Sequence, residues 1–152
     1  MLPSNCCCGT QAPVNIVGPP GQSTSGANGA DGAIVLLGQG PSLDFNTTAD
    51  QLISGFPAKY IITQIVVFNA FAALGVAAGG IYTGAAKTGS IIIPASTTYS
   101  AVTDSAKWIQ LNLGVPATTG HDVLTAATLY LTLETPTGSG ATATVNVYGY
   151  AL

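Results

Sequence analysis

Three consecutive cysteines, Cys6-Cys7-Cys8, form the densest group of reactive side chains in the chain. Their spacing lacks the C-x₂-C separation that lets two thiolates hold one zinc ion. Neighbouring cysteines also bond to each other only with strain. Where several copies of the chain meet, such thiols can form interchain disulfides once the environment is oxidising. The sequence leaves three interpretations open: interchain disulfides, a metal site, or thiols that merely pack.

Two further segments resemble catalytic motifs without completing one. His121-Asp122 is a neighbouring His–Asp pair, but adjacent residues of an extended loop point apart, and the chain has no Gly-x-Ser-x-Gly nucleophile turn. Segment 84–89 has the Lys-Thr of a phosphate-binding loop, but Ala86 stands where a glycine should precede the lysine, and no helix is expected after it. We predict a loop histidine at 121 and a hairpin turn at 84–89.

Carboxylates are too sparse for metal binding or glycan hydrolysis within one chain. Segment 28–32, Asn-Gly-Ala-Asp-Gly, offers only Asp31, whereas calcium takes six to eight oxygen ligands, so a site there would need several chains. Glu134 is the only glutamate and is expected at the outward end of a strand, so it has no obvious partner for acid–base work. We therefore predict a protein that is not an enzyme and has no cofactor or resident metal.

One row of side chains has the composition of a carbohydrate-binding surface. Its members alternate along a single segment near the C-terminus: Thr142, Thr144, Asn146, Tyr148 and Tyr150. The same alternation is typical of an ordinary solvated or interfacial strand face. Both interpretations stay open.

The composition of the whole chain narrows its partners. Of 152 residues only 6% are charged, the three cations are all lysines (Lys59, Lys87 and Lys107), and the net charge is -3. Nucleic-acid binding depends on clustered basic residues, so we predict no nucleic-acid partner. The apolar fraction is 47%, which indicates surface buried either in a membrane or between subunits.

A membrane location is not expected. The longest apolar region, 61–78, is interrupted by polar residues and glycine, so it lacks the roughly 20 continuous apolar residues of a spanning helix. Residues 1–11 have neither the basic start nor the apolar stretch of a signal peptide. We expect a protein made in a cytoplasm that hides its apolar surface by association with other copies.

The composition changes near residue 33. Residues 1–32 contain the run Gly18-Pro19-Pro20-Gly21 and then Gly26, Gly29 and Gly32, and they show almost no periodic apolar pattern. Glycine at every third position is what three polyproline-type chains need around a shared axis, although this run is short and interrupted. We predict an extended, collagen-like N-terminal arm over 1–32, which meets other copies or a larger assembly, followed by a folded domain over 33–152.

The folded domain has the period-two pattern of strands. Leu129, Leu131 and Leu133 alternate with polar or aromatic residues, and the segments 108–113 and 144–148 behave likewise. Further strands are expected at 33–37, 51–54, 60–69, 80–83, 90–93 and 98–102, and turns at 38–41, 55–57, 87–89, 114–116 and 136–140, while 70–78 is expected to be a loop or irregular strand. Short strands at this spacing predict an all-β, antiparallel sandwich or jelly roll.

The expected strand at 60–68 is apolar on both faces. Simple alternation places Ile61, Ile65 and Val67 on one side and leaves four candidates for the other, namely Tyr60, Ile62, Val66 and Phe68. A strand at the surface of a monomeric sandwich should have one wet face. We predict that these four residues contribute to a subunit interface, in a homotrimer.

Three segments of the region 59–150 have recognisable motifs: Gly79-Gly80-Ile81-Tyr82-Thr83, Leu129-Tyr130-Leu131-Thr132-Leu133 and Ala141-Thr142-Ala143-Thr144-Val145. With these motifs the region resembles a family of small structural proteins of tailed bacteriophage virions. The Gly-Pro-Pro-Gly arm is similar to collagen-like segments of phage fibres and capsid-attached proteins. The resemblance implies a β-sandwich in the virion and supplies no catalytic residues.

From this resemblance we expect a structural protein that decorates or cements a phage capsid as a trimer, with other virion proteins as partners. The alternative is a fibre-tip or receptor-binding domain that recognises host surface glycans. A small virion-associated hydrolase is disfavoured by the scarcity of paired carboxylates.

Overall fold

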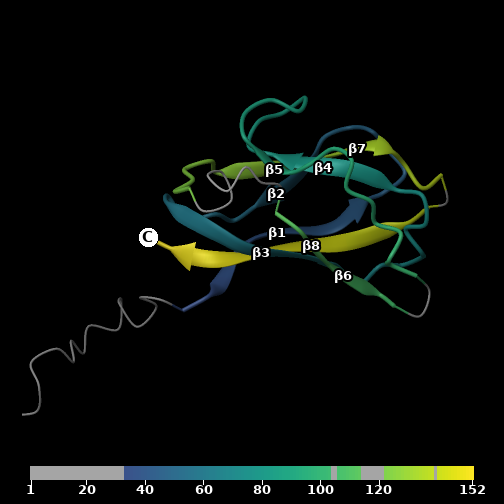
Figure 1. Cartoon of the computed structure of the whole chain (residues 1–152), viewed down its shortest axis with the longest axis horizontal. Coiled ribbons are helices and arrows are strands. Elements are labelled where there is room, and N and C mark those ends of the chain that lie inside the picture. The colour runs from purple at the N-terminus through teal and green to yellow at the C-terminus, as the bar shows by residue number, and fades with distance from the viewer. Residues whose placement is uncertain (1–32, 104–105, 114–121, 139) are drawn as a thin grey trace, which may run out of the picture.

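The computed structural model describes residues 33–103, 106–113, 122–138 and 140–152, and every regular element in these ranges is a strand (Figure 1). The strands are β1 (Val35–Asp44), β2 (Gln51–Ser54), β3 (Tyr60–Phe68), β4 (Ala78–Tyr82), β5 (Ile91–Ile93), β6 (Trp108–Leu111), β7 (Thr128–Thr135) and β8 (Thr142–Ala151). The described residues include no helix that is long and apolar enough to cross a membrane. The all-β prediction is therefore confirmed.

The eight strands form one antiparallel sheet in the order β5-β4-β7-β2-β1-β8-β3-β6. The first four strands in sequence pair with the last four in reverse order, β1 with β8, β2 with β7, β3 with β6 and β4 with β5. Two further pairings, β3 with β8 and β4 with β7, assemble two groups of four strands. A single residue pair, Gln39 with Ser54, joins β1 to β2 and so links the groups.

One hydrophobic core lies inside this sheet. Residues from strands at opposite ends of the strand order, such as Ile93 of β5 and Leu111 of β6, belong to the same buried cluster, so the sheet curls until it is nearly closed. Tyr99 and Phe45 meet edge to face in this core, with ring centroids 5.1 Å apart. Full burial of each aliphatic side chain contributes about 1.5–3 kcal/mol to folding, which makes this core the main source of stability.

The strand pattern read from the sequence holds best where alternation is regular. Leu129, Leu131 and Leu133 of β7 are all buried, and β2 has the expected bounds. Segment 70–77 is a loop, as expected. The segment expected to form a strand at 98–102 is instead a turn that follows an isolated bridge from Thr98 to Ala78, because its amide groups bond locally, Val102 to Tyr99.

The predicted turn at 38–41 is wrong, because these residues lie within β1. Two register shifts, between Leu36 and Gly38 and between Gly40 and Leu43, let β1 stay paired with β8 on both sides of the Gly-Pro segment. Bulges accommodate proline, which cannot donate to the ladder, and glycine, which has no side chain to pack.

The predicted shared face of β3 is wrong as well. Tyr60 and Ile62 are 0% and 1% exposed and belong to the core, and further along the strand Ile65 is buried instead of its neighbour Val66. The register with β8 shifts between Ile62 and Gln64, so an extra residue changes which side chains point inward. Tyr60 and Ile62 are therefore not interface residues, because they pack inside their own chain.

Gly149 shows how closely β1, β8 and β3 approach each other. It lies in β8 between Val35 of β1 and Ile62 of β3. A Cβ atom there would overlap the backbone carbonyl oxygen of Ile61 and crowd the Leu37 side chain. Only glycine fits this position. The absence of a side chain there allows β1, β8 and β3 to lie at their observed spacing.

Candidate functional site

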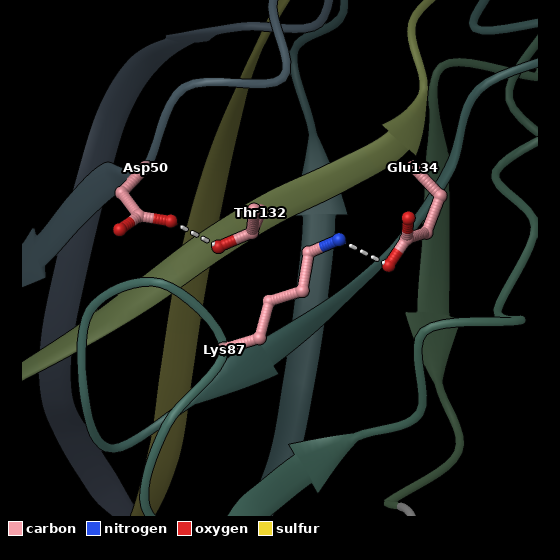
Figure 2. A network of polar contacts seen from close by, with 4 residues as sticks. All are labelled: Asp50, Lys87, Thr132 and Glu134. Atoms are coloured by element: carbon pink, nitrogen blue, oxygen red, sulfur yellow. Dashed lines mark hydrogen bonds and ion pairs between the residues drawn. The ribbon is translucent and has the colours of Figure 1, made fainter.

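The densest group of charged residues is a cluster on the outer surface of β7, which we call the charged cluster: Asp50, Lys87 and Glu134 (Figure 2). One oxygen of Asp50 accepts a hydrogen bond from the Thr132 hydroxyl at 2.5 Å. Its other oxygen accepts one from the Ala86 amide at 2.6 Å. Lys87 forms an ion pair with Glu134, with its Nζ 2.5 Å from Oε1. Three segments far apart in sequence are thereby tied together: the residue before β2, the β4–β5 loop and β7.

These contacts favour the charged forms of Asp50 and Lys87. The Thr132 hydroxyl, and then the Ala86 amide, lower the pKa of Asp50. The hydrogen bond to Glu134 raises the pKa of Lys87. A general acid needs a raised carboxyl pKa, and a nucleophilic lysine needs a lowered one. The charged cluster is therefore built to hold the β4–β5 loop on the sheet and is poorly suited to proton transfer.

The loop held by the charged cluster is the hairpin predicted at segment 84–89. The Gly84 amide donates to the Thr88 carbonyl at 3.0 Å, which closes the turn. Ala86 and Lys87 have φ angles of 53° and 62°, a left-handed conformation that costs about 1 kcal/mol or more for each non-glycine residue. The bonds from this loop to Asp50 and Glu134 stabilise it in that conformation. The hairpin turn predicted at 84–89 is confirmed by the antiparallel pairing of β4 with β5 on either side of it.

The second candidate surface is the outer side of β1, β8, β3 and β6, which we call the amide–aromatic face. The central part of this surface is formed by six uncharged residues: Gln39, Val66, Phe68, Trp108, Gln110 and Asn146. Cross-strand pairing places them side by side, Gln39 opposite Asn146, Asn146 opposite Val66, and Val66 opposite Gln110. Phe68 lies opposite Trp108 in the next row. Asp44, the last residue of β1, is the only charged residue in these four strands.

Most of the amide groups on this face bond to each other. The Gln39 amide donates to Oδ1 of Asn146 at 2.8 Å, and the Asn146 amide donates to the Tyr148 hydroxyl at 2.9 Å. The Gln64 amide donates to Oε1 of Gln110 at 3.1 Å. Asn146 is only 6% exposed although its side chain lies on the outer side of the sheet. The central part of this face is therefore uncharged, and most of its amide groups have hydrogen-bond partners.

Aromatic side chains project from the same face. Trp108 is 63% exposed at the edge strand β6, and Leu36 is 50% exposed at the start of β1. Tyr148 of β8 lies directly opposite Leu36 of β1 and Gln64 of β3. A large exposed tryptophan beside half-buried aromatic residues is the composition of many protein–protein interfaces.

Several predicted site residues lie outside the described residues. These are Cys6, Cys7 and Cys8, the arm residues Gly18, Pro19, Pro20, Gly21, Gly26, Gly29 and Gly32, the Asn28 to Gly32 segment, and His121. Asp122 is exposed. Of the row suggested as a carbohydrate surface, Thr144 and Asn146 are buried, while Thr142, Tyr148 and Tyr150 are partly exposed.

Sequence reasoning missed Asp50, Thr132 and Gln39 as members of these surfaces. Asp50 and Thr132 are 82 positions apart, and no local pattern links them. Gln64 and Gln110 did carry a signal, because each stands next to an apolar residue of an expected strand, whereas Gln39 lies between two glycines. Recognising them would have required the strand register.

Neither surface includes an enclosed site. Among the described residues there is no pocket and no group of three or more side chains that could hold a metal ion. Every buried side-chain polar atom in the described part of the chain has a hydrogen-bond partner. No family model matches this chain, and neither does any curated protein or solved structure.

Proposed function

We propose that this protein is a non-enzymatic structural component of a bacteriophage virion, a jelly-roll β-sandwich that decorates or cements the capsid as a homotrimer. It would be made in the host cytoplasm and act in the particle. The observation that supports this proposal is the pairing of β1 with β8, β2 with β7, β3 with β6 and β4 with β5. A long antiparallel hairpin of strands wound into a jelly roll would pair its strands in this order, and jelly rolls occur in viral capsid proteins and in lectins.

A fold by itself does not define a function, so the surfaces carry the rest of the argument. The charged cluster holds a loop on the sheet, and its contacts favour the charged forms of Asp50 and Lys87. The amide–aromatic face has no pocket for a small substrate. Both features suit a protein that works by covering surface area, as a capsid decoration protein does.

The N-terminal segment, residues 1–32, supplies the attachment in this proposal. It is rich in glycine and proline, and it joins the body directly before β1. Extended segments bind other proteins by adding a strand to an exposed sheet edge, with main-chain hydrogen bonds as the source of affinity. Because the chain has so few charged residues, this binding should persist at about 0.5 M salt, where surface charges are screened within a few ångströms.

Removal of residues 1–32 tests the attachment. The shortened protein should keep its β-sheet circular dichroism, because the strands and core begin at Val35. It should fail to rebind particles from which the full-length protein has been removed. Full rebinding by residues 33–152 would place the attachment on the folded body.

A second function is favoured by one observation. Jelly rolls also occur in lectins. Trp108 and Tyr148 have rings of the kind that stack on sugars, and they lie on a face rich in amides, which form hydrogen bonds with sugar hydroxyl groups. The alternative is therefore a fibre-tip domain that recognises host surface glycans.

Purified particles distinguish the two functions. Hundreds of copies in each particle, counted by gel densitometry, and earlier rupture of depleted particles on heating or osmotic shock are expected for a cementing protein, since many weak contacts add up. A few copies in each particle, unchanged robustness on depletion and lost adsorption to host cells would instead establish the receptor-binding function.

A further inference from the structure

We propose that the amide–aromatic face is the surface through which this chain binds other copies of itself. This inference rests on the oligomeric part of the proposed function and names its contact surface, with Val66, Phe68 and Trp108 at its centre. It does not depend on where in a virion the protein acts.

Charge is the first argument for a second copy of this chain as the occupant. Two identical chains, each with a net charge of -3, repel each other, and a contact through neutral surface adds no close like-charge pair to this repulsion. The outward positions of β8, β3 and β6 have no charged residue. Interface cores are depleted in charged residues and enriched in tryptophan, tyrosine and phenylalanine, all three of which occur here.

The hydrogen bonding of the face is the second argument. Covering a polar group is costly when it loses its bond to water and gains no other. On this face Gln39, Asn146 and Tyr148 already bond to one another, so a protein surface can cover them at little cost. A sugar, in contrast, brings hydroxyl groups that need open donors and acceptors, and Asn146 at 6% exposure offers few.

The position of the N-terminal segment is the third argument. Its thirty-two residues end directly before β1, one of the strands of this face. Ile34 and Leu36, at that junction, are 55% and 50% exposed. The spacing of Gly26, Gly29 and Gly32 is that of chains that wind around one another in threes. The chain thus enters the folded domain beside its neutral face, and a contact between copies there would continue the one made by the arm.

The outer surface of the other group of four strands, β5-β4-β7-β2, provides a matched control. Leu52 of β2 is 58% exposed, close to the 63% of Trp108, and its side chain lies on the outer side of the strand group that includes the charged cluster. If exposure alone promoted association, both residues would matter. The proposal requires that only Trp108 does.

The test compares full-length Trp108→Glu and Leu52→Glu with the unaltered protein by sedimentation velocity, in reducing buffer so that cysteines cannot link subunits. The unaltered protein should sediment as an oligomer at micromolar concentration. Loss of a central interface tryptophan should raise the dissociation constant about thirty-fold or more. Leu52→Glu should leave it within about two-fold. A monomeric unaltered protein, an unchanged oligomer in Trp108→Glu, or dissociation by Leu52→Glu would each overturn the proposal.

Tryptophan fluorescence tests the same surface without a substitution. Trp108 is the only tryptophan in the chain, so its emission reports on this face alone. Acrylamide should quench it several-fold less efficiently in the oligomer than after dilution to monomer. Equal quenching in both states would overturn the proposal even if the oligomer forms. Rupture of depleted particles is measured separately, so failure of the contact surface and failure of the capsid function are distinguishable.

Discussion

The two outer surfaces of this sheet use polar residues in opposite ways. On the charged cluster, Asp50, Lys87 and Glu134 hold a loop whose backbone includes two left-handed non-glycine residues. On the amide–aromatic face, Gln39 and Asn146 bond across neighbouring strands and restrain no loop. The first arrangement fixes local structure while leaving its charges in water. The second leaves a neutral area, which another protein can cover without burying an unpaired charge.

This difference also separates the energetics of the two surfaces. The side chains of Lys87 and Glu134 are 40% and 43% exposed, and ion pairs so open to water contribute little to stability. Asn146 is nearly buried, so its bonds cannot be replaced by water when a partner is lost. We therefore expect substitutions on the neutral side to have larger effects than substitutions on the charged side.

The largest effect is expected beneath the amide–aromatic face, at Gly149. Gly149→Ala should reduce the free energy of unfolding by about 4 kcal/mol or prevent folding, because the new Cβ would overlap the Ile61 carbonyl oxygen. Urea denaturation followed by circular dichroism measures the change. Gly138→Ala serves as the control, since Gly138 has open space around it and only its φ of 71° opposes a side chain, at a cost of about 1 kcal/mol. Equal effects at both positions would contradict the close packing of β1, β8 and β3 around Gly149.

A smaller effect is expected at Asn146. Asn146→Ala should reduce the free energy of unfolding by about 2 kcal/mol, because it removes the partner of both the Gln39 amide and the Tyr148 hydroxyl at a buried position. Thr142→Ala, on the same strand and more exposed, should change it by less than about 0.5 kcal/mol. A stable Asn146→Ala variant would show that the amide bonds of this face are dispensable.

The sequence predicted the parts of both surfaces that depend on regular alternation. Leu129, Leu131 and Leu133 point inward as expected because β7 alternates inward and outward residues along its length. The same reasoning assigned β3 the wrong faces, because an inserted residue at Thr63 exchanges the inward and outward positions beyond it. A bulge depends on the partner strand, and a pattern within one segment does not include that partner.

The candidate surfaces were less predictable for a related reason. The threonine and tyrosine spacing of β8 indicates its outward row, but the neighbours of that row come from distant positions, such as Gln39, which is 107 residues from Asn146. The hydrogen bond of Asp50 to Thr132 likewise joins distant segments. Propensity and turn signals are local, whereas a surface is defined by which strands lie side by side. Strand order was the missing information.

On the charged side, Asp50 should give the protein a specific dependence on acid. Its pKa is lowered in the folded state, so its contribution is complete above the pKa of the unfolded chain, about 3.9. That contribution is lost as the pH falls through the lower folded-state pKa. Asp50→Asn should therefore be less stable than the unaltered protein at pH 7, by about 1 kcal/mol, and the difference should shrink below about pH 4. Urea denaturation at both pH values measures it. Asp44→Asn, which replaces another carboxylate of the chain by an amide, is the control for the loss of one negative charge. A difference that does not change with pH would indicate that the Asp50 contacts do not depend on its charge.

The smallest effect is expected from the ion pair itself. Lys87→Met should leave the urea midpoint unchanged, because both charges remain hydrated in the folded protein and salt screens their attraction. Its effect should instead be local. The loop loses its contact with Glu134 but keeps the bond from the Ala86 amide to Asp50, so hydrogen exchange at residues 84–89 should accelerate modestly while β7 stays protected. Asp50→Asn should accelerate exchange in the same loop more strongly, since it weakens the bond that holds the backbone. If Lys87→Met lowered the urea midpoint as much as Asn146→Ala, the two surfaces would not differ in the way inferred from their exposure.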